Sequence, residues 1–393
     1  MFTFDSKTRN ITLTLIAIGV ITIIAGFIFD PVRMWSSLLH NAFYFNAIAL
    51  CGLFFVSVQY VAQAGWAIGF IRVPQAMAGF LKYGCAALLL IFLLNTYLGH
   101  HSLYHWTDAE LYNQGSPEYD PIMAGKAGFL NIPFFVIRLV LYGLIWAGFA
   151  HMLRKNSIME DMDGGLEHYR KNFKLAAIFV VLFGITSSTS AWDILMSIDA
   201  HWFSTLFGWY TFAGLFVSGL AMMCLLVLWL QSKGYYDNVN NNHLHDVGKF
   251  MFAFSIFWTY LWFSQFMLIW YANLPEEVVY YQVRWENYKL LWIMNLFINF
   301  LAPFLVLMSR DAKRQRQILV VAGIIIIGGH WLDVFLMVMP GTLGSHASIG
   351  WFEIGTMLGF LGAFLYVTLN ELTKAAMVPK NDPMLPESLH HHI

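Results

Sequence analysis

The sequence predicts an all-α integral membrane protein with about ten transmembrane helices, and three observations support this fold class. Hydrophobic residues make up 59% of the 393 positions and charged residues only 11%, a balance that water-soluble domains do not need. Ten apolar segments reach the roughly 20 residues that an α-helix needs to cross a bilayer. Lysine and arginine are concentrated in alternate connections between these segments.

The predicted spans follow one another along the whole chain, which we treat as a single membrane domain, residues 1–393. Flanking helices at residues 11–29 and 349–369 enclose the others. Because no small-residue cleavage site follows residues 11–29, we expect this first helix to be retained. The eight inner spans are predicted at residues 39–62, 79–98, 131–152, 175–195, 203–230, 250–274, 290–308 and 318–339.

The orientation follows from the positions of lysine and arginine. Of the 22 such residues, 17 lie on the side of the N-terminus, and only Arg33, Lys126, Arg284 and Lys289 lie on the other side. The remaining one, Arg138, falls inside a span. The positive-inside rule therefore predicts cytoplasmic N- and C-termini, which requires an even number of spans. The net charge of −1 gives no indication of a nucleic-acid partner.

Two connections outside the spans are long enough to carry structure of their own. Residues 99–126 exceed a tight turn, and we expect one amphipathic interfacial helix followed by a loop. The outer connections are aromatic and acidic, which suits a docking face. Residues 378–393 are polar and proline-rich, and they are predicted to form a flexible cytoplasmic tail or a strand that binds a partner.

The side chains that would ligate a redox cofactor are scarce. A haem between helices needs histidines facing each other, yet only His330 lies well inside a span, and His40 and His151 sit at span ends. The three cysteines lie in apolar segments without a CxxC motif. We therefore expect this chain to bind no haem and no iron–sulfur cluster, with no cofactor held covalently or by metal ligation.

One histidine cluster, in the connection after the third span, leaves two interpretations open. His101 and His105 are spaced i,i+4 and could bind zinc, with His100 beside them. No acidic or cysteine ligand lies next to them, so interfacial histidines are the favoured interpretation. We assign no metal site.

Titratable side chains inside the spans are costly and are functional candidates by default. His330 and Asp333 are spaced i,i+3 on one face of the ninth span, near its outer end. A carboxyl group beside an imidazole in hydrocarbon makes a natural proton donor and acceptor. We therefore interpret this pair as a site that handles protons.

Further ionisable groups lie in the outer halves of other spans. Arg138 is in the fourth span, and Glu353 lies one turn into the tenth. Asp193, Ser197 and His201 are spaced i, i+4 and i+8, and they share a face if the fifth helix continues through them. The alternative for Arg138 is a purely structural ion pair with one of these carboxylates.

Two weaker patterns concern packing. The aromatic segments 207–212 and 257–266 could stack on a quinone ring, although core packing is the favoured interpretation. Gly355 and Gly359 form a GxxxG motif on the last span, which permits close helix approach within the bundle or to another subunit.

Four segments resemble one family of membrane subunits. They are AGWAIGFIRVPQAM (residues 64–77), WDILMSIDAHWFSTLFGWYTFAG (192–214), LHDVGKFMFAFSIFWTYLWFSQFMLIWYANLPEE (244–277) and GHWLDVFLMVMPG (329–341). Over essentially the whole chain, the sequence resembles the NrfD or polysulfide-reductase (PsrC-like) membrane-subunit family, and within it the ActF type, quinone-binding subunit 2, of bacterial alternative complex III.

The resemblance implies two four-helix bundles, residues 39–195 and 203–339, between the flanking helices. It also implies a complex of the bacterial inner membrane that oxidises menaquinol or ubiquinol and passes electrons to cytochrome c or to a terminal oxidase. The implied partners are an iron–sulfur/molybdopterin-like protein, multihaem and monohaem cytochromes c, a paralogous NrfD-like subunit and membrane lipids. The redox centres would lie in those other subunits.

The resemblance also carries over a set of candidate residues for a proton path or quinone contact. The matched positions are Asp193, Asp199, His201, Lys249, Gln265, Glu276, His330 and Asp333, and Arg138 and Glu353 join them as buried charges. No catalytic residue is assigned. Two other functions stay open: a stand-alone secondary transporter, for which a broken helix such as that at Pro303 lacks a counterpart in the first half, and a purely structural membrane anchor.

Overall fold

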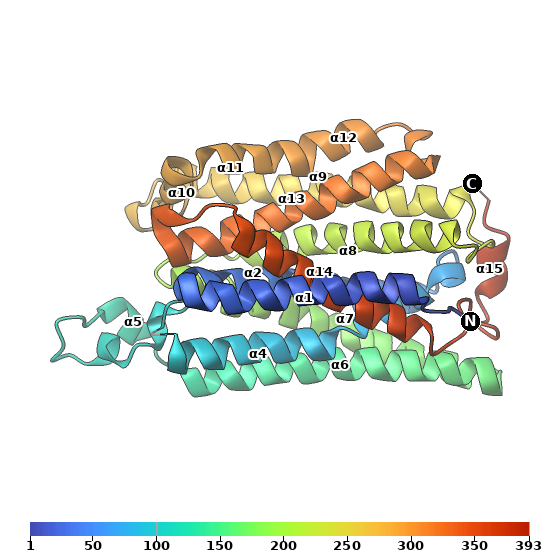
Figure 1. Ribbon diagram of the computed structural model, residues 1–393, viewed down its shortest axis with the longest axis horizontal. Helices are drawn as coiled ribbons and strands as arrows, with labels where there is room; N and C mark the ends of the chain where they lie inside the picture. Colours follow the sequence, from blue (N-terminus) through green and yellow to red (C-terminus); the bar gives the residue numbers. More distant parts are fainter. Residues whose placement is uncertain (100, 393) are drawn as a thin grey trace.

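The computed structural model describes residues 1–99 and 101–392, which form an elongated bundle of helices (Figure 1). Within these residues, ten helices are long and apolar enough to cross a membrane, so the predicted class and number of spans are confirmed. They cover Ser6–Phe29, Pro31–Ala62, Arg72–Leu98, Ile132–Asp163, Glu167–Ile194, Leu206–Ser232, Asn241–Ala272, Lys289–Leu307, Arg316–His346 and Trp351–Leu372.

The α-helices of the described residues are named in chain order. They are α1 (Ser6–Phe29), α2 (Pro31–Ala62), α3 (Arg72–Ala78), α4 (Leu81–Leu98), α5 (Pro121–Lys126), α6 (Ile132–Asp163), α7 (Glu167–Ile194), α8 (Phe207–Ser232), α9 (Asn241–Ala272), α10 (Pro275–Asn287), α11 (Lys289–Leu296), α12 (Ala302–Leu307), α13 (Arg316–Leu343), α14 (Trp351–Leu372) and α15 (Leu385–Leu389).

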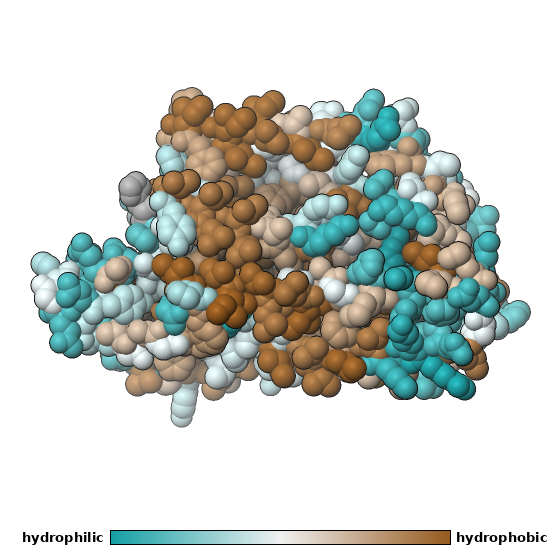
Figure 2. Space-filling model, turned by 90° about the horizontal axis from the view of Figure 1, so that it is seen from below, coloured by the Kyte–Doolittle hydropathy of each residue, from teal (hydrophilic) through white to brown (hydrophobic). Residues whose placement is uncertain are grey.

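The two ends of the bundle differ in what they carry. The N- and C-termini and α15 lie together at one end, which we call the terminal end, whereas α5 and α10 lie at the opposite, loop end (Figure 1). Seen from the side of α4 and α6, a broad hydrophobic band crosses the molecule between hydrophilic ends (Figure 2). This is the surface expected of a chain that crosses a bilayer several times with both termini on one side.

The core of the molecule lies along α2 and α8. In their most apolar stretches, 78% and 83% of the residues are buried, whereas the corresponding value for α1 is 22%. Helix α2 packs against α4 and α7 on one side and against α8 and α13 on the other. Helix α6 packs against α4 and α7, and α9 and α12 pack beside α8 and α13. Two groups of helices therefore meet along α2 and α8.

The flanking helices α1 and α14 pack against each other through small residues. A Cβ added to Gly19 of α1 would lie 2.3 Å from the Cα of Gly359 in α14, and one added to Gly355 would lie 2.2 Å from Oγ1 of Thr22. No side chain fits at these separations, so the two backbones touch. The GxxxG motif therefore serves a contact within the chain.

The eighth span is interrupted near its middle. Pro303 has no backbone N–H to donate, and the chain forms a π-helical turn at Phe297–Leu301 between α11 and α12. This wide turn carries Asn299 and begins two residues after Asn295, and both side chains are buried. The irregular backbone thus lies next to the polar centre of the second group of helices.

The long connection at the loop end differs from the expected amphipathic helix. Residues 101–126 contain two 3-10 turns, His105–Thr107 and Ala109–Tyr112, followed by the short helix α5. Pro117 and Pro121 interrupt the segment, because proline cannot continue a helical hydrogen-bond pattern through its own N–H. The prediction of a single interfacial helix for this connection is wrong.

The C-terminal tail, which was expected to be flexible, is packed in the structure. Ser388 of α15 is fully buried, accepts a hydrogen bond from the Gly69 N–H at 3.0 Å and donates one to the Trp66 carbonyl at 2.9 Å. The Glu387 carboxylate accepts from the Gly65 N–H at 3.1 Å. The polar side chains that indicated flexibility instead satisfy backbone groups exposed by the glycines between α2 and α3.

Candidate functional site

The most distinctive polar site surrounds Asp333 on α13, in the half of the bundle nearer the loop end. The carboxylate is 2% exposed and accepts hydrogen bonds from three neutral side chains. Tyr210 of α8 donates its hydroxyl to Oδ1, Asn295 of α11 donates to Oδ1 at 2.8 Å, and Trp258 of α9 donates to Oδ2 at 3.0 Å. Four helices thus converge on one carboxyl group.

His330, one helical turn from Asp333, lies beside the carboxylate without bonding to it. Its Nδ1 is 3.9 Å from Oδ2 of Asp333, and neither ring nitrogen has a hydrogen-bond partner among the described residues. The ring packs edge-on against Trp258, and Gly214 leaves room for it, since a Cβ there would lie 3.1 Å from Nδ1. The two residues are neighbours, as the i,i+3 spacing predicts, but the three neutral donors hold Asp333.

A short chain of amides extends from Asp333 toward the terminal end. Asn299 donates to the side-chain oxygen of Asn295 at 2.6 Å, and Asn295 in turn donates to Asp333. Asn299 is fully buried, and its own Oδ1 has no partner among the described residues. These amides can hydrogen-bond water or each other but do not titrate near neutral pH.

A small cavity adjoins Asp333 on the side of the loop end. Its free space is about 20 Å³, enough for about one water molecule, and its lining includes Gln265, Tyr281 and Asn295. Gln265 is 3% exposed and donates to the Tyr281 hydroxyl at 3.0 Å, while its Oε1 has no partner among the described residues. The predicted residue Gln265 therefore lines the same small cavity as Asp333.

A larger cavity of about 470 Å³ opens nearer the loop end and brings together three of the predicted residues. Asp199, His201 and Glu276 line it, and so do Tyr280 and Arg284. The last two also line the small cavity beside Asp333. Tyr280 and Arg284 therefore form the wall between the buried carboxylate and the outer cavity.

Arg284 of α10 is the centre of this wall. It is 3% exposed, and it donates to the Leu336 carbonyl at 3.0 Å and to the Tyr280 carbonyl at 2.8 Å. Its guanidinium lies over the Tyr280 ring, 3.2 Å from the centroid, and 3.4 Å from Asp199. Burial raises the pKa of Asp199, although the Arg284 charge opposes this shift. The outer cavity therefore contains a carboxyl group that binds its proton more tightly than usual.

The buried charges in the first group of helices are paired with each other. Arg138 donates to both oxygens of Asp193, at 2.8 and 3.0 Å, and Tyr142 donates its hydroxyl to Asp193 at 2.6 Å. The guanidinium lies 3.9 Å from the ring centroid of Phe129 and 4.3 Å from that of Phe134. The structural alternative for Arg138 is the one that the geometry supports, since this bidentate pair joins α6 to α7.

Glu353 is likewise paired, at the loop end of α14. Arg33 of α2 donates to its two oxygens at 2.7 and 2.8 Å, and the Ser37 hydroxyl donates at 3.2 Å. Glu353 also accepts from the Gly350 N–H at 2.8 Å, which caps α14. This ion pair ties the last helix to α2 and leaves no free acid in that position.

The remaining predicted residues lie apart from Asp333. Helix α7 ends at Ile194, so Asp193, Ser197 and His201 do not share one helical face. His201 is half exposed and bonds Asp120 of the loop end at 2.6 Å. Lys249 lies on α9 at the terminal end, where it pairs with Asp246 at 2.5 Å. The condition for a shared face, a fifth helix that continues through all three residues, is therefore not met.

Sequence reasoning missed four residues that make the site: Tyr210, Trp258, Asn295 and Arg284. The first two fall inside the aromatic segments 207–212 and 257–266, where the favoured interpretation was core packing. Both are indeed buried, but each also directs a polar atom at Asp333. Arg284 was counted only as a positive charge on the outer side. The aromatic residues near it in the sequence were the available signal that its side chain is buried.

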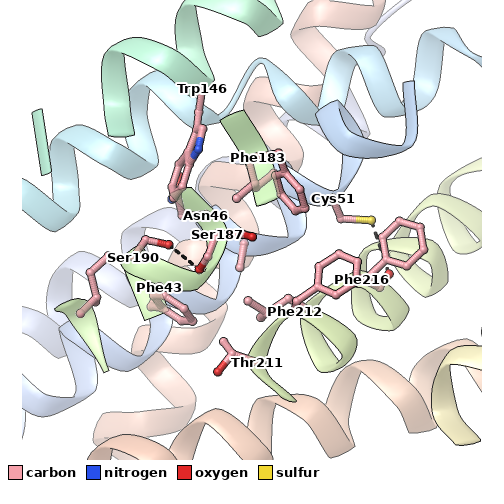
Figure 3. A pocket seen from close by; sticks show the side chains of 14 residues that line it. Phe43, Asn46, Cys51, Trp146, Phe183, Ser187, Ser190, Thr211, Phe212 and Phe216 are labelled. Atoms are coloured by element: carbon pink, nitrogen blue, oxygen red, sulfur yellow. Dashed lines mark hydrogen bonds between the residues drawn. The ribbon is translucent and has the colours of Figure 1, made fainter. Parts of the chain in front are cut away.

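A third cavity lies where the two groups of helices meet, between α2, α6, α7 and α8 (Figure 3). Aromatic rings surround it, with the Ser190 hydroxyl donating to the Ser187 carbonyl at 3.0 Å and the Cys51 thiol to the Phe216 carbonyl at 3.4 Å. Its free space is about 30 Å³, the size of a water molecule and too small for a quinone ring.

Two of the three clustered histidines, His101 and His105, lie within the described residues. His101 lies 2.6 Å from the Thr107 hydroxyl, and His105 lines the outer cavity, while His100 lies outside the described residues. Within residues 1–99 and 101–392, no group of three His, Cys, Asp or Glu side chains is placed to hold a metal ion.

Fold and site together define a multi-pass helical membrane protein with a buried carboxyl group beside a small cavity on the side of the loop end. In comparison with known proteins, no family model matches the chain, and no curated protein matches its sequence.

Proposed function

We propose that this chain is a membrane subunit of a respiratory quinol:cytochrome c or quinol:oxidase oxidoreductase of the alternative complex III type, in a bacterial inner membrane. It carries no redox cofactor of its own and contributes a proton path and a scaffold. The four sequence segments that resemble the ActF type support the assignment to this class. The observation that carries the proton path is the Asp333 site, with its connection to the outer cavity.

The surroundings of Asp333 suit proton exchange because, within the described residues, no arginine or lysine side chain forms an ion pair with it. A titratable group inside a membrane-spanning segment is a functional candidate by default. Tyr210, Trp258 and Asn295 stabilise the anion by hydrogen bonds, and these bonds weaken when the carboxyl group is protonated. A proton at Asp333 can then be exchanged through the small cavity.

The outer route would pass the wall formed by Tyr280 and Arg284. Asp199 on the far side binds its proton tightly, and its ion-pair partner Arg284 lies between it and Asp333. A shift of this one guanidinium would join the small cavity to the outer cavity. A menaquinone or ubiquinone ring would fit the outer cavity of about 470 Å³ better than the cavity of about 30 Å³ between the groups of helices.

The partners would dock at the loop end. The electron carriers proposed for this complex, an iron–sulfur/molybdopterin-like protein and multihaem and monohaem cytochromes c, belong on that side. Residues 101–131 and α10 supply the exposed polar surface there. Lipids and the paralogous membrane subunit would cover the hydrophobic band of Figure 2.

The test is proton translocation by the assembled complex in proteoliposomes. Asp333→Asn keeps the shape of the side chain but cannot change its charge, so we expect electron transfer from quinol to continue while the protons moved per electron fall to the value for uncoupled turnover. Asp311→Asn, an exposed carboxylate at the terminal end, is the matched control. An Asp333→Asn complex that pumps like the wild type would reject the proton path.

A second preparation, the chain reconstituted alone, separates this proposal from a transporter. We expect the isolated chain to take up no substrate in response to an ion gradient, and we expect the chain purified from its native membrane to bring haem-containing partners with it. Gradient-driven uptake by the isolated chain would favour the secondary transporter and reject a subunit role.

A further inference from the structure

A groove at the terminal end carries an excess of positive charge that the proposed function does not use. Its free volume is about 390 Å³, and it lies between the start of α4, the second half of α6 and the end of α14. We call it the basic groove and define it by Lys82, His151, Arg154, Lys155, Glu371 and Lys374, which line it.

Arg154 forms the buried floor of the basic groove. It is 9% exposed, its Nη2 donates to the Glu371 carbonyl at 2.5 Å, and its Nε lies 3.5 Å from the Glu371 carboxylate. Its third nitrogen, Nη1, is buried and has no hydrogen-bond partner among the described residues. A buried guanidinium donor without a partner is costly, and an anionic oxygen would satisfy it.

The charges on the rim are not balanced within the groove. Glu371 is the acidic side chain that lines it, and it already pairs with Lys374 at 2.7 Å and with Arg154. Lys82 and Lys155 then add two exposed ammonium groups to the same space. Because like charges gathered at one place repel each other, the groove favours an anion that approaches several of them at once.

The position of the groove indicates which kind of anion fits. Ala78, Ala147, Ala150 and Ile158 supply apolar walls among the charged side chains. On the face formed by α4 and α6, the hydrophobic band ends where the hydrophilic terminal end begins (Figure 2). Exposed side chains of both helices, including Leu90 and Leu144, continue the apolar surface away from the charges. A free phosphate would leave these walls uncovered, whereas acyl chains would cover them.

We propose that the basic groove binds an anionic phospholipid. Arg154 and the ammonium groups of Lys82 and Lys155 hold its phosphate, and its acyl chains lie along α4 and α6. Basic pockets between helices at the membrane surface recognise anionic headgroups by this combination of charge and apolar contact. The bound lipid would join α4, α6 and α14, three helices that meet at the groove.

The test uses the full chain in a neutral detergent, with phosphatidylglycerol as the probe and native mass spectrometry as the readout. We expect phosphatidylglycerol to bind at least tenfold more tightly than phosphatidylcholine. Lys82→Gln/Lys155→Gln should remove most of this preference while leaving the thermal unfolding of the lipid-free chain unchanged. The matched control is Lys233→Gln/Lys249→Gln, which removes two exposed ammonium groups of the terminal end outside the groove.

Three results would overturn the proposal. Equal binding of phosphatidylglycerol and phosphatidylcholine would show that headgroup charge does not determine lipid binding. An unchanged preference in Lys82→Gln/Lys155→Gln, or an equal loss in the control variant, would place the lipid elsewhere. Displacement of phosphatidylglycerol by millimolar inorganic phosphate would assign the groove to a free anion. None of these measurements depends on electron transfer or on Asp333.

Discussion

Asp193 and Asp333 are both buried acidic side chains, one in each group of helices, but they have opposite surroundings. Both are buried, with 0% and 2% exposure. Asp193 faces a guanidinium that donates to both its oxygens, whereas Asp333 faces a phenol, an indole and an amide. The first arrangement pairs the carboxylate with a counter-charge, and the second surrounds it with neutral donors. The contrast separates a structural ion pair from the site that we propose for proton exchange.

The same contrast explains why the two sites need different supports. The Arg138–Asp193 pair needs only two helices, α6 and α7, because opposite charges hold each other. The Asp333 site needs α8, α9, α11 and α13 together, since each neutral donor comes from a different helix. The π-helical turn after α11 lies beside this site, and Asn299 on that turn donates to Asn295.

The largest expected effect comes from breaking the charged pair. Arg138→Ala leaves Asp193 buried without a counter-charge, which costs about 3–5 kcal/mol of unfolding free energy in comparable buried pairs. We expect denaturant-induced unfolding of the detergent-solubilised chain to show a fall of this size in the unfolding free energy. The double variant Arg138→Ala/Asp193→Ala should recover part of this loss, because neither charge is then left alone. A double variant as unstable as the sum of its single variants would show that the two residues are not coupled.

Asp333→Asn should destabilise the chain much less than Asp193→Asn. The amide oxygen still accepts from Tyr210 and Asn295, and the loss is limited to the bond from Trp258, which then faces an amide N–H. We expect a cost of about 1–3 kcal/mol, the range for an unsatisfied buried polar group. Asp193→Asn in the same assay loses its charged partner and is the direct comparison. Equal losses in the two variants would contradict the distinction between the sites.

The spans and the pairing partners differ in how far the sequence could predict them. Hydropathy and charge bias predict ten spans, because the bilayer imposes the same length and composition on each one. They also mark Arg138 and Asp193 as costly buried charges. The partner of Arg138 could not be chosen, since three carboxylates lay at similar predicted depths, and only the packing of α6 on α7 selects Asp193.

The Asp333 site was only half predictable for a related reason. The i,i+3 spacing of His330 and Asp333 is a property of one helix, and it places them side by side as expected. Tyr210, Trp258 and Asn295 come from three other helices, and their rotation about the helix axes depends on packing that periodicity does not record. The packed tail was missed likewise, because Ser388 bonds to backbone groups more than 300 positions away.

The wall between Asp333 and the outer cavity gives a prediction that depends on pH. The pKa of Asp199 is raised above 3.8, chiefly by burial, so the folded chain binds this proton more tightly than the unfolded chain. The wild type should therefore lose stability relative to Asp199→Asn as the pH rises through the interval between 3.8 and the raised pKa, and the difference should stay constant above it. Thermal unfolding of both chains across this range measures the effect. A wild type that instead loses stability relative to Asp199→Asn as the pH falls through this interval would contradict the raised pKa.

The smallest effect is expected at the surface pair of His201 and Asp120. Burial opposes the shift, but hydrogen bonds from Met123, His201 and Ile122 lower the pKa of Asp120. Its stabilising contribution is thus present above 3.8 and is lost as the pH falls through the lowered pKa. Because His201 is 53% exposed, we expect His201→Gln to change the unfolding free energy by less than about 1 kcal/mol at neutral pH.

The experiment on His201 has two readouts. Unfolding of His201→Gln in detergent measures stability, and proton translocation by the assembled complex measures function. Since His201 lines the outer cavity but does not touch Asp333, its loss should slow proton entry less than Asp333→Asn does. Equal loss of proton translocation in the two variants would show that the group critical for proton transfer lies in the outer cavity and not at the buried site. The distinction between a surface ion pair and a buried carboxyl group held by neutral donors would then fail as a guide to function.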